Sequence, residues 1–144
     1  QLKTALVTGG AARIGAAIVR DLARHDFAVA IHTHSSTDAA EALAAEIVAG
    51  GGRACVIRAD LTQDGAPEKI IAAAADALGP LDLLVNNASI FEDDSIETFS
   101  SEIFDRHVAI HLKAPSILIR DFVAQLPQDP KGSWSMSSTS ACGS

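Results

Sequence analysis

Short apolar runs alternate with stretches of helical periodicity along the chain. The runs cover residues 4–8, 27–31, 53–57 and 81–85 and are mostly apolar. A short apolar run bounded by turn residues is typical of a strand that is buried on both faces of a sheet. We therefore predict four buried strands.

Helices are predicted between and after these strands. Their ranges are residues 14–24, 39–48 and 67–78, with a longer helix within residues 99–126. The apolar positions of the first helix are Ile14, Ile18, Val19 and Leu22. Pro115 lies inside the long helix, where proline should bend the helix or remove one hydrogen bond.

Turn residues mark both ends of the second helix. Ser36, Thr37 and Asp38 are candidate caps at its start, and the glycine run 50–52 ends it. Strands and helices therefore alternate, which is typical of a parallel sheet with helices on both faces. The predicted fold class is α/β, a Rossmann-type doubly wound sheet that is truncated at its C-terminal side.

The composition fits one domain. The chain has 144 residues, of which 48% are hydrophobic and 20% charged, and its mean hydropathy is +0.22. This length can bury a core without disulfide or metal staples, and the charged fraction is too low for a disordered chain. We predict a dinucleotide-binding domain over residues 1–133 and an atypical tail over residues 134–144.

Charge and cysteine content exclude several function classes. The net charge is −7 without a basic block, so we expect no nucleic-acid partner. No apolar run reaches the roughly 18 residues of a membrane span, so no membrane partner is expected, and the N-terminus lacks the features of a signal peptide. Cys55 and Cys142 are typical of reduced thiols, which favours a cytoplasmic protein.

A glycine-rich turn, residues 8–15, joins the first strand to the first helix. Its sequence is Thr-Gly-Gly-Ala-Ala-Arg-Ile-Gly. Small residues at such a turn let a diphosphate approach the backbone, and the helix N-terminus offers free N–H groups. Gly15 would let the helix pack close to the strand. The alternative is a tight turn without a ligand.

Three segments together resemble the short-chain dehydrogenase/reductase family. They are the turn Thr-Gly-x-x-x-x-x-Gly, Asp60-Leu61 after the third strand, and Asn86-Asn87-Ala88-Ser89 after the fourth. The usual family forms are Thr-Gly-x-x-x-Gly-x-Gly and Asn-Asn-Ala-Gly. Arg13 and Ser89 depart from them in the manner of the pteridine-reductase branch, where Asn-Asn-Ala-Ser-x-Phe is found. The resemblance covers about residues 3–133.

The end of the second strand favours NADP(H) as the cofactor. A site that prefers NAD places an acid there to bind the ribose 2′-hydroxyl, and residues 32–37, which lead up to Asp38, contain no acid. Arg13, His34, Ser35 and Ser36 could instead supply donors to a 2′-phosphate. The alternative is that the serines only cap the helix.

The resemblance implies the remaining cofactor contacts. Asp60 and Leu61 would lie along the adenine, although Asp60 could instead cap a turn. The other expected cofactor-binding residues are Gly9, Ile14, Gly15, Asn87, Ala88 and Ser89. Asn86 could equally tie strands together.

Phe91 and His111 are candidates for the reacting end of the site. The resemblance implies that Phe91 stacks on a flat substrate, although it could instead anchor a loop. His111 stands where most of the family has an asparagine of the proton relay, and it could be catalytic or structural. The chain contains no tyrosine, so the family's Tyr-x-x-x-Lys proton donor is absent.

The tail after Ser133 allows two interpretations. In one, Ser137-Ser138 is the family's serine pair and Ser138 is catalytic. In the other, the reading frame shifts after Ser133, because a restored guanine with suitable codons would give a buried strand. The encoding DNA distinguishes them.

The expected function is an NADP(H)-dependent oxidoreductase that reduces a carbonyl or a pteridine-like C=N bond of a small-molecule substrate. The alternative is a catalytically inactive nucleotide-binding fragment or interaction module. The resemblance also implies a homo-oligomer through the long helix.

Overall fold

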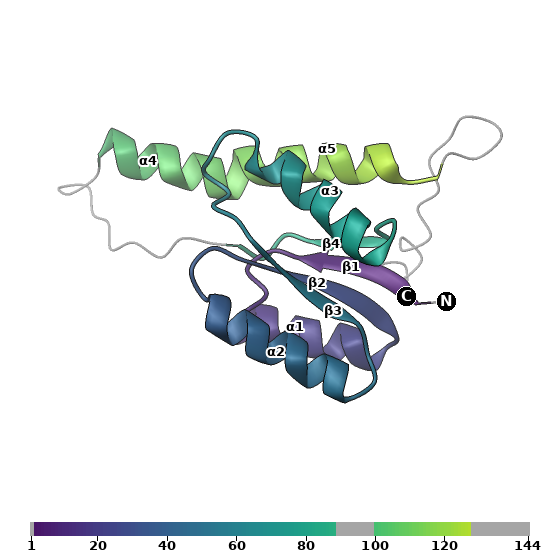
Figure 1. Ribbon diagram of the computed structural model, residues 1–144. Coiled ribbons are helices and arrows are strands. Elements are labelled where there is room, and N and C mark those ends of the chain that lie inside the picture. Colours follow the sequence, from purple (N-terminus) through teal and green to yellow (C-terminus); the bar gives the residue numbers. More distant parts are fainter. Residues whose placement is uncertain (1, 89–99, 128–144) are drawn as a thin grey trace, which may run out of the picture.

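Four parallel strands form one sheet, in the order β3-β2-β1-β4. The computed structural model describes residues 2–88 and 100–127 (Figure 1). The strands are β1 (Lys3–Val7), β2 (Phe27–Thr33), β3 (Ala54–Arg58) and β4 (Leu83–Val85). Because β1 pairs with β2 on one side and β4 on the other, the chain changes direction across the sheet at β1. In doubly wound folds, such a switch point is where ligands bind.

Helices cover both faces of the sheet (Figure 1). On one face lie α1 (Arg13–Arg24) and α2 (Thr37–Ala49). On the other lie α3 (Ala66–Leu78) and a continuous helical stretch. That stretch consists of α4 (Ser101–Val108), the π-helical turn η1 (Ala109–Lys113) and α5 (Ala114–Gln125). The predicted fold class is confirmed, with the predicted element order.

Alternate residues of the strands supply two hydrophobic cores. Leu6 and Ala30 face the core beneath α3 and α5, which also contains Leu118. Val7 and Ile31 face the core beneath α1 and α2. The strands are apolar throughout because both faces of the sheet are covered.

Ile14 differs from its predicted place on the buried face of the first helix. Its side chain is 71% exposed, whereas Val19 is fully buried. Ile14 lies in the first turn of α1, two residues after the N-cap residue Ala12.

The fourth strand is shorter than predicted. Leu81 is buried but precedes β4, and the side-chain amide of Gln125 completes its backbone hydrogen bonding. Leu81 N–H donates to Gln125 Oε1 at 2.7 Å, and Gln125 Nε2 donates to the Leu81 carbonyl at 2.9 Å. One side chain thus links α5 to the start of the last described strand.

Two helix details refine the sequence prediction. Ser36 is the N-cap residue of α2, but its side chain makes no capping hydrogen bond. The expected disturbance at Pro115 takes the form of the π turn immediately before α5, while α4 and α5 remain nearly in line (Figure 1). Proline has no N–H to donate and its ring crowds the carbonyl four residues earlier, so a wider turn accommodates it.

Within residues 2–88 and 100–127, no helix combines the length and the apolar character needed to cross a bilayer. The predicted tail, residues 134–144, lies outside the described residues.

Candidate functional site

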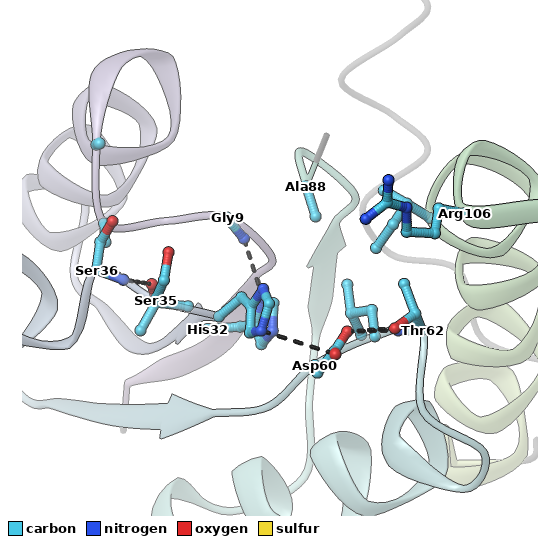
Figure 2. A pocket seen from close by; sticks show the side chains of 14 residues that line it. Gly9, His32, Ser35, Ser36, Asp60, Thr62, Ala88 and Arg106 are labelled. Atoms are coloured by element: carbon cyan, nitrogen blue, oxygen red, sulfur yellow. Dashed lines mark hydrogen bonds and ion pairs between the residues drawn. The ribbon is translucent and has the colours of Figure 1, made fainter. Parts of the chain in front are cut away.

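A cavity of about 390 Å³ lies at the carboxyl ends of β1, β2 and β3 (Figure 2). This volume is within the usual range for a small-molecule or cofactor site. Seven of the residues predicted to bind a cofactor line it: Gly9, His34, Ser35, Ser36, Asp60, Leu61 and Ala88. The structure therefore brings together residues from four loops that are far apart in the sequence.

The segment that leads into α1 lines this cavity. Ala11 and Ala12 line it, and Ala12 is the N-cap residue of α1. Alanine has no side-chain acceptor, so no side-chain capping bond is made there. The first N–H groups of a helix lack partners within the helix and carry a partial positive charge, which suits a diphosphate.

Glycine is required at two positions of the turn because backbone segments meet there. Gly9 has φ +63°, and a Cβ on it would lie 2.9 Å from Ala88 Cα. A Cβ on Gly15 would overlap the Gly9 carbonyl oxygen and lie 2.7 Å from Asn87 Nδ2. Gly15 therefore permits the close approach of α1 to the turn after β1, whereas the prediction was a close approach to the strand.

Thr8 and Asn87 join the glycine turn to the end of β4. Thr8 Oγ1 accepts hydrogen bonds from the backbone N–H groups of Asn87 at 3.0 Å and Ala88 at 3.1 Å. Asn87 Nδ2 donates to the Gly9 carbonyl at 3.1 Å. Asn87 thus shapes the turn, and it is not among the residues that line the larger cavity.

Arg13 occupies a backbone conformation that favours glycine. Its φ is +54°, in the left-handed region that costs a residue with a Cβ roughly 1 kcal/mol. This explains physically why related turns carry glycine at the corresponding position. Arg13, Ile14 and Gly15 directly follow the lining residue Ala12 in the sequence, but they are not among the residues that line the cavity.

The end of β2 and the loop after β3 form the polar side of the cavity. His34 Nε2 lies 3.7 Å from Asp60 Oδ2, and the His34 side chain is 66% exposed. Asp60 Oδ1 accepts hydrogen bonds from the Thr62 N–H at 2.9 Å and the Thr62 hydroxyl at 2.6 Å. Burial raises the pKa of the Asp60 carboxyl, but the Thr62 hydrogen bonds and nearby His34 outweigh this effect and lower its pKa overall.

His32 and Arg106 also line the cavity, and the sequence prediction missed both. His32 is a polar side chain near the end of an apolar strand, a signal that could have been noticed. Arg106 reaches the cavity from α4, and Figure 2 shows it near Ala88. Its position depends on how α4 is oriented over the sheet, which no local pattern specifies.

His111 lies at a second, smaller cavity of about 180 Å³. Thr8, Asn86 and Ala88 also line this cavity, so His111 is close to the end of β4. Its ring stacks on that of His107, with the centroids 5.6 Å apart. The structure therefore places His111 beside the predicted nicotinamide end, while its catalytic role stays a prediction.

Three predicted site residues, Ser89, Phe91 and Ser138, lie outside the described residues. Within the described part of the chain, no group of three or more His, Cys, Asp or Glu side chains could hold a metal ion.

Comparison with known proteins identifies the family of this chain. A sequence model of the short chain dehydrogenase family matches residues 3–141, and the chain belongs to this family. A short-chain dehydrogenase/reductase, FrzI, from Cladobotryum is 34% identical, over 90% of this chain and 50% of its own length. L-Rhamnose 1-dehydrogenase (NAD(P)(+)) from Azotobacter vinelandii is also 34% identical, over 90% of this chain and 52% of its own.

A solved structure with the same fold is the alternative dihydrofolate reductase 1, FolM, of Brucella suis in complex with NADP. It is 50% identical, with a TM-score of 0.83, over 88% of this chain and 52% of that one. A blue fluorescent protein from a metagenomic library, in complex with NADPH, is 38% identical with a TM-score of 0.83, over 88% of this chain and 52% of its own. The chain thus spans about half the length of the relatives it matches.

Proposed function

We propose that the chain binds NADP(H) in the cavity at the carboxyl ends of β1, β2 and β3. One observation supports this most directly: the N-cap of α1, the turn at Gly9 and the polar end of β2 all line the same cavity. The diphosphate would lie beside Gly9 at the N-terminus of α1, and the adenine beside Asp60 and Leu61.

The choice of NADP(H) over NAD(H) rests on the residues that would face the ribose 2′-oxygen. His34, Ser35 and Ser36 line this side of the cavity and can donate hydrogen bonds, while Arg13 supplies positive charge near the turn. The Asp60 carboxylate lies beside them, with its Oδ2 3.7 Å from His34 Nε2. The two Brucella and metagenomic relatives, solved with NADP and NADPH, agree with this choice.

Titration with NADPH and NADH tests the proposal. We expect NADPH to bind more tightly, and the substitutions Arg13→Ala and His34→Ala to weaken NADPH far more than NADH. An equal loss for both cofactors would contradict the assignment of these residues to the 2′-phosphate.

The proposed reaction is reduction of a carbonyl or pteridine-like C=N bond, with NADPH supplying the hydride when it is bound. The FolM relative supports the pteridine-like substrate class. Because the 144 residues contain no tyrosine, we expect dinucleotide binding without turnover from this chain alone. A reductase assay beside the titration separates an enzyme from a nucleotide-binding fragment.

We also propose a homo-oligomer through the helical stretch from α4 to α5, within the cytoplasm. Three large apolar side chains are exposed along it: Phe104, Leu112 and Ile119. Burial of such a surface is favourable. Light scattering should detect a dimer or larger assembly, and Leu112→Asp should reduce it; a monomeric wild-type chain would refute this proposal.

A further inference from the structure

His32 makes a hydrogen bond with each ring nitrogen, although it is almost fully buried. Its Nδ1 accepts a hydrogen bond from the Gly9 N–H at 3.1 Å (Figure 2). Its Nε2 lies 2.8 Å from the Ala59 carbonyl oxygen. The residue is 2% exposed. The ring therefore joins the glycine turn after β1 to the segment that leads from β3 to Asp60.

These two contacts define the proton position on the ring. Gly9 N–H can only donate, so Nδ1 must be unprotonated; the Ala59 carbonyl can only accept, so Nε2 must carry the proton. The ring is consequently neutral in this arrangement. The backbone of His32 adds a third link, because its carbonyl accepts from the Gly10 N–H at 2.9 Å.

We propose that His32 is a positioning residue for the dinucleotide, whose neutral ring holds the Gly9 amide and the Ala59 carbonyl at the separation the cofactor requires. This inference rests on the proposed function, because that function supplies the ligand, NADP(H). The protonation state of the His32 ring does not depend on the proposed function and can be measured without a ligand.

We call the two ring hydrogen bonds of His32, to Gly9 and to Ala59, the brace. Protonation of the ring would break this brace. A proton on Nδ1 would oppose the Gly9 N–H, so one hydrogen bond would be replaced by two facing donors. Burial is the main cause that lowers the pKa of His32; His34 also lowers it, whereas the Ala59 bond and Asp60 act in the opposite direction. Arg106 of α4 lines the same cavity. We therefore expect the brace to hold at neutral pH and to fail in acid.

Two substitutions separate the two ring contacts. His32→Asn places an amide oxygen near the position of Nδ1 and can accept from Gly9, whereas His32→Gln places an amide nitrogen near Nε2 and can donate to Ala59. His32→Leu makes neither bond. At pH 7.5, we expect NADPH affinity to fall at least tenfold in His32→Leu, and by a smaller factor in His32→Asn and His32→Gln, which each keep one of the two bonds. An affinity of His32→Leu equal to that of the wild type would overturn the proposal.

The pH profile distinguishes positioning from a merely structural role. The wild-type chain should lose NADPH affinity as the pH falls below the unperturbed histidine range, and His32→Asn should lose less. The series is repeated in a His34→Gln background, because His34 is a second histidine at the same cavity. The difference between wild type and His32→Asn cancels the titration of the cofactor's own phosphate. Parallel profiles for the two proteins would overturn the proposal.

Two measurements without ligand keep this test separate from the proposed function. Nitrogen-15 NMR of the ring should show the Nε2–H form at pH 7.5, and Gly9 amide exchange should be at least tenfold faster in His32→Leu than in wild type. If no dinucleotide binds but both results hold, the proposed function fails while the brace stands. An Nδ1–H ring, or unchanged Gly9 exchange, would overturn the brace itself.

Discussion

Gly15→Ala tests whether close backbone approach governs the turn between β1 and α1. The added Cβ would overlap the Gly9 carbonyl oxygen and lie 2.7 Å from Asn87 Nδ2 and 3.0 Å from Gly10 Cα. The first and last of these atoms belong to the backbone, so a side-chain rotation cannot relieve the contacts. The turn or the helix must therefore move.

The expected loss of stability is about 2–4 kcal/mol. Overpacking a tight site typically costs about 1–3 kcal/mol, and displacement of the Gly9 carbonyl also breaks the bond from Asn87, which is worth about 1 kcal/mol. For a domain of this size we expect the melting temperature to fall by roughly 5–15 °C. NADPH affinity should fall with it, because the same turn faces the cavity.

Thermal denaturation followed by circular dichroism measures the first effect, and fluorescence titration with NADPH measures the second. Gly50→Ala is the matched control. Gly50 has φ −82° at the end of α2, and a Cβ there would meet its nearest atom at an ordinary 3.5 Å. A Gly15→Ala chain as stable as Gly50→Ala, with unchanged NADPH affinity, would refute the reasoning.

Three further substitutions have defined outcomes. Thr8→Val leaves two N–H groups without their acceptor and should cost about 2–4 kcal/mol in urea unfolding, whereas Thr8→Ser should cost less than half as much. Arg13→Gly should raise the free energy of unfolding by up to about 1 kcal/mol, because glycine adopts the left-handed conformation without strain, and it should weaken NADPH binding. Arg13→Lys should change neither the stability nor the NADPH affinity. An unchanged stability in Arg13→Gly would contradict the backbone strain at this position. Asp60 has a lowered pKa in the folded chain, so it stabilises the fold above its unfolded pKa, and this contribution is lost as the pH falls through its folded pKa. In Asp60→Asn the free energy of unfolding should therefore fall less steeply as the solution is acidified. An unchanged slope would count against the Thr62 bonds.

The sequence predicted the sheet and most of one side of the site for a local reason. Apolar runs and glycine turns report burial and backbone conformation at their own positions, and parallel strands bring their carboxyl ends to one edge. Gly9 and His34 could therefore be placed together from the pattern, whereas Asp60 was assigned to the site by the resemblance to the family. In the structure, all three residues line one cavity.

The features that were missed depend on contacts between distant segments. The ring of His32 links segments at Gly9 and Ala59, 23 and 27 residues away. Gln125 completes the hydrogen bonds of Leu81, 44 residues away. Ile14 was placed on the buried face because helical periodicity identifies a stripe but not where the helix leaves the sheet.

The π turn η1 keeps α4, which precedes it, in rotational phase with α5. Ile110, Ala114 and Leu118 all face the sheet at four-residue intervals, across the junction of η1 and α5. A π turn closes its hydrogen bonds over one residue more than an α turn does, so η1 takes up one residue without rotating α4 relative to α5. Loss of one residue within η1 would therefore leave a regular helix with Arg106 still over the cavity. In a regular α-helix each residue turns the chain by about 100°, so loss of a residue between Arg106 and η1 would instead point Arg106 away from the cavity while the sheet stayed intact.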